Sequence, residues 1–396
     1  MIRNLERFFL LLLLLLLPTQ LAYHYWPAWS LVHGIRVDYL SPTLYLTDLI
    51  ILALFLLSRF RVRVPLSIIV FTVLNILISY SPNIAIYSWL RLLEFYWLFK
   101  YLTKNSLVLS TSHLALSLAV LWTSLLAWSQ FFFQRSVGGP LYWLGERAFN
   151  IGTPGIATIS LAGRLFLRPY ATLPHPNALA VYLLVAGLII FYLRPKSLLS
   201  HISILISALT IPLTFSRTAI ILEIMILGFW VLLKIKKIKL KILFSGLLLL
   251  LLLQLTRISS PSSLSDRLAL NQKAILAISK NLLIGVGLGN FIPAAAHDSS
   301  FIIHNSFLTT QPVHNIYLLL ASELGLPATI ALSLIVIRSL SHLLSNDKFL
   351  IICAFTILLS GAVDHYWLTL HQNQLLLTVI LALLVVKSGY ETEHIL

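Results

Sequence analysis

Charged side chains are scarce in this chain of 396 residues. They make up 10% of it, whereas hydrophobic residues make up 59%. A soluble domain has about 25% charged residues and roughly half apolar ones. Apolar runs of about 15 to 25 residues recur from end to end, close to the length that a bilayer-spanning helix needs. We therefore expect an integral membrane protein whose backbone polar groups are satisfied within helices, with no separate soluble domain.

Cysteine and acidic residues are also rare. The single cysteine, Cys353, excludes an internal disulfide, and its place inside an apolar run indicates a packing role. The 13 acidic residues form no Asp-x-Asp pair and no His-Glu-x-x-His motif. The sequence therefore indicates no metal site, and we expect neither a metal nor a cofactor.

The apolar runs predict an all-α polytopic membrane protein, with residues 1–396 forming one membrane domain of about twelve transmembrane helices. The expected spans are 8–23, 44–58, 65–80, 84–99, 107–132, 175–193, 200–214, 218–233, 242–255, 315–337, 349–367 and 373–387. The run Leu10–Leu17 could instead be a signal-peptide core, but no small-residue cleavage site follows cleanly, so we favour a retained span.

The basic residues set the expected orientation and explain the net charge of +15. Lys and Arg gather beside short loops, as in 59–63 and 234–241, where the positive-inside rule applies. This pattern places both termini in the cytoplasm and the protein in the cytoplasmic (inner) membrane. The positive charge is then accounted for by topology and lipid headgroups, and we expect no nucleic-acid partner.

Two loops on the expected outward side are unusually long, at about 133–174 and 256–314. Loops of this length in a compact protein are usually functional or disordered, and the apolar residues within both argue against disorder. Within the second loop, Ser263–Leu283 predicts an amphipathic helix that lies along the outer surface or covers a cavity.

The outward side also holds the polar residues that we consider candidates for chemistry. Arg217 opens an expected span, where an arginine is costly unless it is paired or hydrated, although snorkelling to the interface is the structural alternative. Arg267 opens the amphipathic helix and could simply pair with Asp266. His314 can accept a proton near neutral pH, and Asn315 can orient it or hold a sugar hydroxyl, but the two could also only start a helix.

Further candidates lie around these positions. Their amides, imidazole and guanidinium groups could bind an anion or a sugar, although rigid helix entries and tight turns explain them about as well. Glu323, two turns further into the membrane than His314, could pair with an arginine or a polar substrate group. The remaining candidates for substrate binding are Arg168, His175, Asn177, Gly285, Gly287, Gly289 and Asn290. Asp364 and His365, at the end of an expected span, could line the same outer cavity.

Several arginines and amides without a metal suit the binding of a pyrophosphate leaving group. An enzyme that faces outward has no ready nucleotide supply, so its substrate must arrive already activated. A lipid pyrophosphate meets that need, and the apolar surface could hold its polyprenyl tail. The chemistry therefore indicates a transfer reaction from a lipid pyrophosphate.

The order of these motifs resembles that of the O-antigen ligase and polymerase superfamily over about residues 133–330. The resemblance rests on Arg168-Pro169-Tyr170, His175-Pro176-Asn177, Ser216-Arg217, Gly285 to Asn290, Pro312-Val313-His314-Asn315 and Glu323-Leu324-Gly325. It implies a GT-C-like glycosyltransferase fold and a metal-independent, inverting transfer from an undecaprenyl-pyrophosphate-linked glycan. It also implies that Arg217 and Arg267 bind the pyrophosphate and that His314 activates the acceptor hydroxyl.

The acceptor stays open at this stage. A ligase is the first expectation, with an O-antigen polymerase or a protein O-oligosaccharyltransferase of the same superfamily as alternatives, so the acceptor is a glycan, a lipid or a protein. A lipid-linked glycan flippase or transporter is the main rival outside the superfamily, since about twelve spans suit such proteins. A noncatalytic envelope-assembly protein is a third possibility. The concentration of polar residues on one face favours the transferase.

Overall fold

The computed structural model describes residues 2–193, 197–241, 245–246, 261–297, 310–346 and 348–388. Most of the expected span 242–255 and part of the second outward loop lie outside these residues. In the described part the chain is mostly helical, which confirms the expectation of a mainly α-helical protein. Three short antiparallel strand pairs were not expected.

The helices of the first half are α1 (Ile2–Leu15), α2 (Leu46–Ser58), α3 (Leu66–Leu77), α4 (Pro82–Lys104), α5 (Ser106–Phe133), α6 (Pro176–Tyr192), α7 (Leu198–Leu213) and α8 (Arg217–Lys234). Those of the second half are α10 (Pro261–Lys280), α11 (Phe291–His297), α12 (Ile316–Leu324), α13 (Leu326–Asn346), α14 (Lys348–Val363), α15 (Tyr366–Thr369) and α16 (His371–Ser388). Three short 3₁₀ turns are η1 (Ala28–Ser30), η2 (Asp38–Leu40) and η3 (Gly139–Leu144).

The strands pair in three antiparallel hairpins or ribbons. The pairs are β1 (Ala22–His24) with β4 (Thr43–Tyr45), β2 (Leu31–Val32) with β3 (Ile35–Arg36), and β5 (Thr158–Leu161) with β6 (Arg164–Leu167). The β5–β6 hairpin turns at Ala162 and Gly163, whose φ angles are both positive, at 49° and 80°. Two consecutive positive φ angles match the twist of a tight hairpin turn.

Most expected spans agree with observed helices to within a few residues, but three differ in a way that matters. The run 8–23 ends as a helix at Leu15, because Pro18 follows and the chain then turns into β1. The run 315–337 is two helices, α12 and α13, and the run 349–367 is also two, α14 and α15. Apolar composition continues through both breaks, so composition alone did not reveal them.

Within the described residues, Ser112–Phe133 is long and apolar enough to cross a membrane by length and composition. Seven further apolar helical stretches of 10–17 residues are described, among them Pro176–Tyr192 and Leu198–Leu213. The helical segments are thus observed.

Helix α6 forms the centre of the fold. Its side chains are buried from Ala178 through Ile190, and it packs against α5, α7, α8, α14 and α16. A helix that is hydrophobic all round is expected in such a central place. Because α6 begins at the end of the first long loop, this packing fixes the loop residues 168–177 against the rest of the protein.

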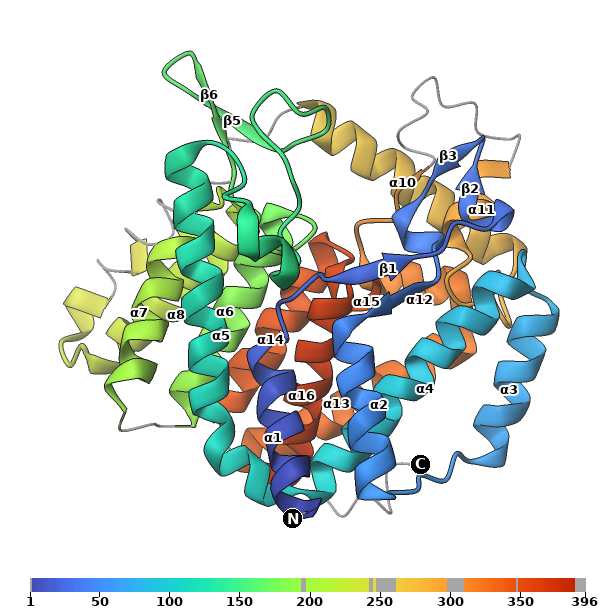
Figure 1. The fold of residues 1–396 in the computed structure, drawn as a ribbon, viewed down its shortest axis with the longest axis horizontal. Helices are drawn as coiled ribbons and strands as arrows, with labels where there is room; N and C mark the ends of the chain where they lie inside the picture. The colour runs from blue at the N-terminus through green and yellow to red at the C-terminus, as the bar shows by residue number, and fades with distance from the viewer. Residues whose placement is uncertain are drawn as a thin grey trace.

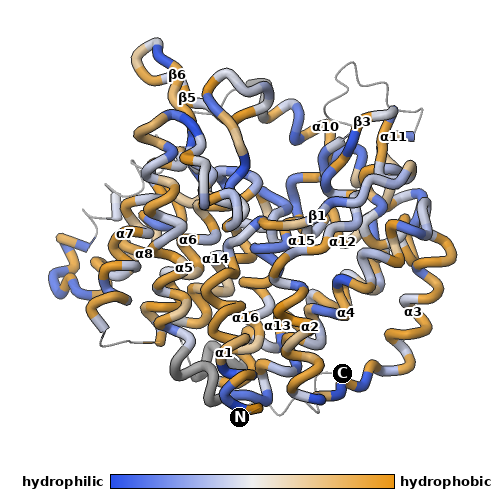
Figure 2. The backbone as a smooth tube through the Cα atoms, viewed as in Figure 1, coloured by the Kyte–Doolittle hydropathy of each residue, from blue (hydrophilic) through white to orange (hydrophobic). Residues whose placement is uncertain are grey.

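The strands β2, β3, β5 and β6 and the helices α10 and α11 lie at one end of the molecule (Figure 1). In Figure 1, α1 begins at the bottom of the view, whereas β2, β3, β5, β6, α10 and α11 lie at the top. Figure 2 shows hydrophobic residues dominating the helices below and hydrophilic ones more frequent in the upper segments. The chain therefore has one polar, loop-rich end, and the two long loops contribute to it.

Gly325 makes the break between α12 and α13 possible. Its φ angle is +81°, and a Cβ atom there would collide with the backbone of Leu283 and Ile284. We expect Gly325→Ala to lower the free energy of unfolding by about 1–3 kcal/mol, from strain and from the close contact. Thermal unfolding of the purified protein in detergent measures this. Gly163→Ala is the matched control, because its φ is +80° but no atom lies within 4 Å of the added Cβ. Equal losses in both variants would contradict the role of the contact.

Candidate functional site

His314 is held in place by its neighbour Asn315, which caps α12. The Asn315 side-chain oxygen accepts hydrogen bonds from the backbone amides of Tyr317 (2.9 Å) and Leu318 (3.0 Å). Its side-chain nitrogen donates to the carbonyl of Ala362 at 3.0 Å. Asn315 thus ties the start of α12 to the end of α14, where Asp364 follows.

His314 and Asp364 form a hydrogen-bonded pair. The Nδ1 atom of His314 lies 3.0 Å from Oδ1 of Asp364, and its Nε2 lies 3.3 Å from Oε1 of Gln311. Burial acts to raise the pKa of Asp364, but the hydrogen bond from His314 and nearby positive charges hold that pKa well below its usual range. An ionised carboxylate only accepts, so Nδ1 carries a proton toward Asp364.

Arg267 reaches the same carboxylate from α10. Its guanidinium donates to the carbonyl of Val363, and its Nη2 lies 3.8 Å from Oδ2 of Asp364. The Arg267 side chain is still 32% exposed, so part of the guanidinium faces the solvent side. The structure therefore brings His314 and Arg267 together through Asp364, although 47 positions separate them in the sequence.

His365 completes this cluster. Its backbone amide donates to Oδ1 of Asp364 (3.0 Å), its ring lies 5.0 Å from that of His314, and its Nδ1 lies 2.6 Å from the hydroxyl oxygen of Thr369. Burial lowers the pKa of His365 to about 3, against the opposing effect of Asp364. His365 is therefore neutral at physiological pH and acts as a wall of the site.

Among the residues that the structure describes, His314, Asp364 and His365 form a group that could hold a metal ion. One ligand atom each from His314, Asp364 and His365 lies within 4.8 Å of the others. The 3.0 Å separation of Nδ1 and Oδ1 is, however, that of a hydrogen bond, and Arg267 already places a positive charge beside the carboxylate. The arrangement fits a histidine–carboxylate pair better than a cation site.

A second group of polar residues comes from the end of the first long loop. Arg168 donates through Nε to the carbonyl of Thr214 (2.7 Å) and through Nη2 to Oδ1 of Asn177 (2.5 Å). His175 caps α6, with Nδ1 accepting from the Asn177 amide (3.1 Å) and lying 3.1 Å from the Tyr366 hydroxyl. These contacts join the loop to the α7–α8 turn and to α15.

A small cavity connects the two groups. Its lining includes Asn177, Ser216, Ser360, Asp364 and Tyr366, which come from α6, the α7–α8 turn, α14 and the segment after it. The Ser216 hydroxyl is buried and has no hydrogen-bond partner among the described residues. The cavity holds about 10 Å³ of water-accessible space, close to what one water molecule needs, and it lies beside an ionised carboxylate.

Arg217 follows Ser216 directly as the first residue of α8. Arg217 is exposed. Burial lowers the pKa of Arg168, and the charge of Arg217 lowers it further. Neither arginine takes part in an ion pair within the described part of the chain. Two neighbouring guanidinium groups without a carboxylate partner make this rim of the cavity attractive to an anion. The structure shows no direct contact between Arg217 and His314.

The glycine-rich stretch is placed differently. The amides of Val286 and Gly287 donate to the carbonyls of Ser322 (2.8 Å) and Glu323 (3.1 Å), and that of Leu288 to the side chain of Asn75 (3.0 Å). Gly285 and Gly289 lie in the same stretch, with positive φ angles. These contacts fasten the stretch to the α12–α13 break and to α3. The amides that we considered for anion binding already have protein acceptors, which favours the tight-turn alternative.

Asn290 and Glu323 belong to the same junction. The Asn290 side-chain oxygen accepts from the Ser81 amide at 2.7 Å, and the Glu323 carboxylate accepts from the Phe291 amide at 3.3 Å. Both side chains are buried. Their contacts are structural, and they lie apart from the pair formed by His314 and Asp364. Asn75, which joins this junction from α3, gave no signal in the sequence.

The amphipathic helix of the second loop is confirmed as α10, but its apolar stripe is not packed inside. Leu264, Leu268, Ile275 and Leu282 are each about half exposed, at 57%, 53%, 57% and 48%. Leu270 and Ala274, on a neighbouring face of the helix, are buried. An exposed apolar stripe beside Arg267 is suited to contact with lipid.

The neutral state of His175 predicts a pH dependence of stability. Burial and the charge of Arg168 lower its pKa to about 4, and Nδ1 must stay unprotonated to accept from Asn177. In the unfolded chain its pKa is about 6.5, so between pH 6.5 and 4 the unfolded state binds more protons and stability falls as pH falls. We expect a loss of about 1–3 kcal/mol from this group over that window.

Thermal unfolding from pH 7 to pH 4 measures this loss. His175→Asn keeps an acceptor for the α6 cap and should reduce the pH dependence by the contribution of this group, while that of the other buried histidines stays. His201→Asn, at an exposed histidine of α7, is the control and should leave it unchanged. The same slope in His175→Asn as in the wild type would contradict the assignment.

Comparison with known proteins agrees with the resemblance read from the motifs. Residues 202–333 match the family model described as O-antigen ligase. This segment contains Arg217, Arg267 and His314, whereas Arg168 and Asp364 lie outside it. A search of curated proteins gave no match. Proteins of this family are membrane proteins of glycosyltransferase type. Over these residues, about a third of the chain, the protein is therefore similar to the O-antigen ligase family, which confirms the resemblance to the O-antigen ligase and polymerase superfamily.

Proposed function

We propose that this protein is a membrane glycosyltransferase that moves a glycan from undecaprenyl pyrophosphate to an acceptor hydroxyl at the outer face of the cytoplasmic membrane. The observation that carries the proposal is the convergence of His314 and Arg267 on the ionised Asp364. The family match over residues 202–333 supports the class of reaction. A fold of about twelve spans, with both termini inside, is part of the proposal.

In the proposed reaction, His314 removes the proton of the acceptor hydroxyl. With the Nδ1 proton donated to Asp364, Nε2 presents its lone pair to that hydroxyl. Asp364 then stabilises the imidazolium that forms. The Gln311 side-chain oxygen, 3.3 Å from Nε2, can accept a hydrogen bond from the newly protonated Nε2.

The acceptor oxygen attacks the anomeric carbon while the bond from that carbon to the pyrophosphate oxygen breaks. The electron pair of the broken bond goes to undecaprenyl pyrophosphate, whose negative charge increases. Arg217, Arg168 and the exposed part of Arg267 stabilise that charge. Attack from the side opposite the leaving group inverts the configuration at the anomeric carbon. The exposed apolar stripe of α10 offers a surface for lipid.

Two features support a transferase over a flippase. Hydrophilic residues are more frequent at the loop-rich end of the molecule (Figure 2), whereas a flippase needs polar groups along a path through the membrane. In addition, Arg91 of α4, whose side chain is 12% exposed, is satisfied by Asp48 (2.6 Å) and Glu94 (2.9 Å), as a structural cluster would be.

A transfer assay in detergent tests the proposal. Purified protein is given an undecaprenyl-pyrophosphate-linked glycan with lipid A-core, a second lipid-linked repeat, or a pilin-like protein as the acceptor. We expect transfer to one of them, at the same rate with and without a metal chelator, because the proposed step uses side chains alone. The productive acceptor distinguishes ligase, polymerase and protein O-oligosaccharyltransferase. Movement of glycan across vesicles without transfer would contradict the proposal.

Dependence on a metal would show itself separately. If chelator abolishes transfer and a divalent cation restores it, then His314, Asp364 and His365 act as ligands and the proposed role of His314 as a base is wrong.

A further inference from the structure

The connection between α1 and α2, residues 16–45, passes beside the candidate site. In Figure 1 its strands β2 and β3 lie next to α10 and α11. Its apolar side chains share one buried cluster with α10 and with Val313, the residue before His314. From the connection these side chains are Val32, Val37 and Leu40, and from α10 they are Leu270 and Ala274. This packing fixes the connection against the two segments that supply Arg267 and His314.

Tyr39 lies in η2, directly before the buried Leu40, and its side chain faces the site. Its ring meets that of His365 edge-on, with the ring centres 5.4 Å apart and the planes at 87°. The ring of His365 lies in turn 5.0 Å from that of His314. Tyr39 is 36% exposed, and its hydroxyl makes no hydrogen bond within the described part of the chain. A single side chain therefore separates this exposed aromatic ring from the proposed base.

Arg147, from the first long loop, is held against the segment that enters α6. Its Nη2 donates to the carbonyl of Pro174 at 2.9 Å, and its Cζ lies 5.4 Å from the ring centre of Tyr170. The residue is exposed, and it takes part in no ion pair among the residues that the structure describes. These two contacts orient the guanidinium and leave its charge without a carboxylate partner.

The acidic residue next to Arg147 in the sequence does not neutralise it. Glu146 is buried, and its carboxylate accepts hydrogen bonds from the side chain of Gln130 and from the backbone amides of Val137 and Gly138, each at 2.8 Å. Glu146 therefore holds the first long loop together from within. The charge of Arg147 is left for a ligand.

The pKa shifts around Tyr39 indicate that the two loops meet at the mouth of the site. Partial burial and the carboxylate of Asp364 raise the pKa of the Tyr39 hydroxyl well above its usual range, whereas Arg147 acts to lower it. Arg147 also acts, after burial and Arg168, to lower the pKa of His175. Charges influence one another strongly only within a Debye length, about 10 Å. Arg147 therefore lies near both Tyr39 and His175.

An exposed aromatic ring and a guanidinium without a carboxylate partner together suit a sugar residue. The C–H face of a pyranose packs on an aromatic ring, and the tyrosine hydroxyl meets its polar edge. A guanidinium presents five N–H donors in a fixed fork, which matches neighbouring sugar hydroxyls or an acidic group on the sugar. Because His314 acts on the acceptor hydroxyl in the proposed reaction, a sugar held beside His365 belongs to the acceptor.

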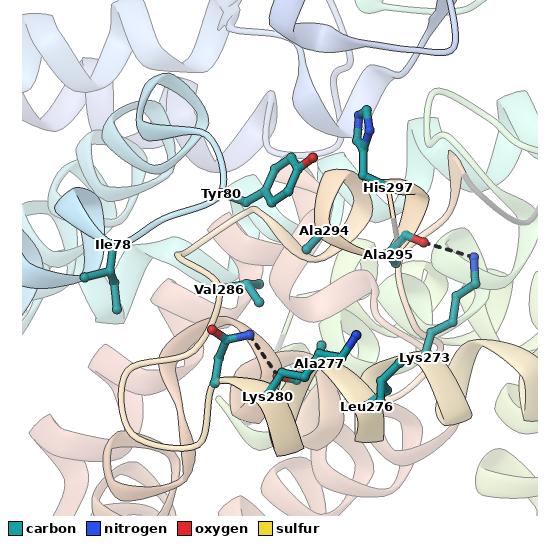
Figure 3. A pocket seen from close by; sticks show the side chains of 11 residues that line it. Ile78, Tyr80, Lys273, Leu276, Ala277, Lys280, Val286, Ala294, Ala295 and His297 are labelled. Atoms are coloured by element: carbon teal, nitrogen blue, oxygen red, sulfur yellow. Dashed lines mark hydrogen bonds between the residues drawn. The ribbon is translucent and has the colours of Figure 1, made fainter. Parts of the chain in front are cut away.

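A larger hollow, of about 360 Å³, lies between α10, α11 and the turn from α3 to α4 (Figure 3). It shares no lining residue with the cavity beside Asp364. Its lysines, Lys273 and Lys280, already take part in interactions within the protein, among them the hydrogen bond from Lys273 to the carbonyl of Ala295 at 3.3 Å. The residues at the mouth of the candidate site, and not those of this hollow, are placed to contact a glycan beside His314.

We propose that Tyr39 and Arg147 form a sugar-binding subsite at the mouth of the candidate site. The subsite holds the terminal sugar of the acceptor on the Tyr39 ring, with its attacking hydroxyl toward His314 and with Arg147 donating to its polar groups. Both residues lie outside residues 202–333, so the segment that matches the family supplies the base and this subsite selects the acceptor. The inference rests on the proposed function for the identity of the acceptor.

Binding to a variant without the proposed base tests the subsite apart from transfer. Isothermal titration uses the purified full chain carrying His314→Ala and three probes: a core oligosaccharide freed from lipid A, a repeat-unit oligosaccharide, and a serine-rich pilin-like peptide. We expect one of the two oligosaccharides to bind and the peptide not to bind, because the proposed contacts need a pyranose ring. Binding of neither oligosaccharide would overturn the proposal.

Variants of Tyr39 on the same His314→Ala background locate the binding. Tyr39→Ala removes the ring and should raise the Kd of the bound oligosaccharide about tenfold or more. Tyr39→Phe keeps the ring and loses only the hydroxyl, so its Kd should lie between those of Tyr39 and Tyr39→Ala. Tyr23→Ala, at a 71% exposed tyrosine of the same connection, is the control and should leave the Kd unchanged. An unchanged Kd in Tyr39→Ala would overturn the proposal.

Arg147 is tested in the same titration. Arg147→Gln removes the charge and most of the donors, and it should raise the Kd about tenfold or more. Arg164→Gln changes another exposed arginine of the same long loop, in the β5–β6 hairpin, and should leave the Kd unchanged. Because Arg147 is exposed, this arm remains informative if thermal unfolding shows that Tyr39→Ala is poorly folded. A wild-type Kd in Arg147→Gln would contradict the subsite.

Transfer kinetics then distinguish acceptor from donor. With His314 present, Tyr39→Ala should raise the KM for the acceptor about tenfold or more, while kcat and the KM for the donor change little, as expected for a contact made equally before and during the reaction. A rise in the KM for the donor alone, or a fall in kcat with unchanged KM values, would contradict the assignment of the subsite to the acceptor.

The outcomes separate this inference from the proposed function. Loss of transfer in His314→Ala with intact, Tyr39-dependent binding supports both. Intact transfer in His314→Ala with the same binding would leave the subsite in place and remove the proposed catalytic role of His314.

Discussion

Replacement of His314 by alanine is expected to lower the turnover of glycan transfer by about 10²- to 10⁴-fold. The reason is that the acceptor hydroxyl loses its general base, whose contribution is typically of that size. The substituted side chain is partly exposed and does not belong to the apolar core, so the protein should still fold. Turnover at saturating donor and acceptor, together with thermal unfolding of the same preparation, measures both points.

His201→Ala provides the control for this variant. His201 is an exposed histidine of α7, and its Nδ1 lies 2.9 Å from the carbonyl of Ser197, the residue that caps the same helix. Its replacement removes an imidazole without touching the candidate site. Turnover in His314→Ala within a factor of a few of that in His201→Ala would show that His314 is not the base.

Asp364→Asn is expected to lower turnover by about 100-fold or more while the substrates still bind. The amide is nearly isosteric with the carboxylate, but its nitrogen can donate to Nδ1 of His314 and so favour the wrong tautomer, in which Nε2 carries the proton. It also removes the negative charge that stabilises the imidazolium and that holds Arg267. The expected pattern is a large fall in kcat with a small change in KM.

The dependence of the transfer rate on pH gives a second test of the ionised state of Asp364. Because its pKa lies well below the usual range, the carboxylate stays ionised throughout the neutral and mildly acidic region. Loss of transfer on acidification in that region therefore reflects other groups. Asp38→Asn, at an exposed aspartate in η2, is the control and should keep wild-type turnover. An Asp364→Asn protein with wild-type kcat would contradict the pairing with His314.

Most helices of this fold could be predicted from composition because apolar runs translate directly into helices in a chain of this kind. The exceptions have a local cause. The run 315–337 breaks at Gly325, where a positive φ and close contact with Leu283 and Ile284 end one helix and start another. Gly325 was visible in the sequence, but its contact with Leu283 is a tertiary one, and apolar composition on both sides concealed the break.

The candidate site was predicted in part. The ends of apolar runs point to Arg217 and His314, and the start of the amphipathic helix points to Arg267. The structure brings His314 and Arg267 together. The partner that joins them, Asp364, lies 50 residues after His314, and no local pattern encodes that contact. The sequence marks Asp364 and His365 as residues that could line the outer cavity, because two polar residues at the end of an apolar run are costly unless they are used or paired, but it does not predict the contact of Asp364 with His314.

The glycine-rich stretch shows the limit of motif reasoning most clearly. Glycines at 285, 287 and 289 suggest free amides near an anion, and the same glycines suit close packing of backbone against backbone. The structure shows the second arrangement, with Val286 and Gly287 hydrogen-bonded to the end of α12. The choice between the two depended on α12 and α3, which are distant in the sequence.

A double-mutant cycle tests the central claim most directly, namely that His314 and Asp364 act as one unit in glycan transfer. Turnover is measured for the wild type, His314→Ala, Asp364→Asn and the protein with both changes, with the same donor and acceptor. Because residues that act as a unit are strongly non-additive, we predict that the double variant is about as slow as His314→Ala alone. A double variant slower than His314→Ala by the full factor lost in Asp364→Asn would show independent roles and contradict the account.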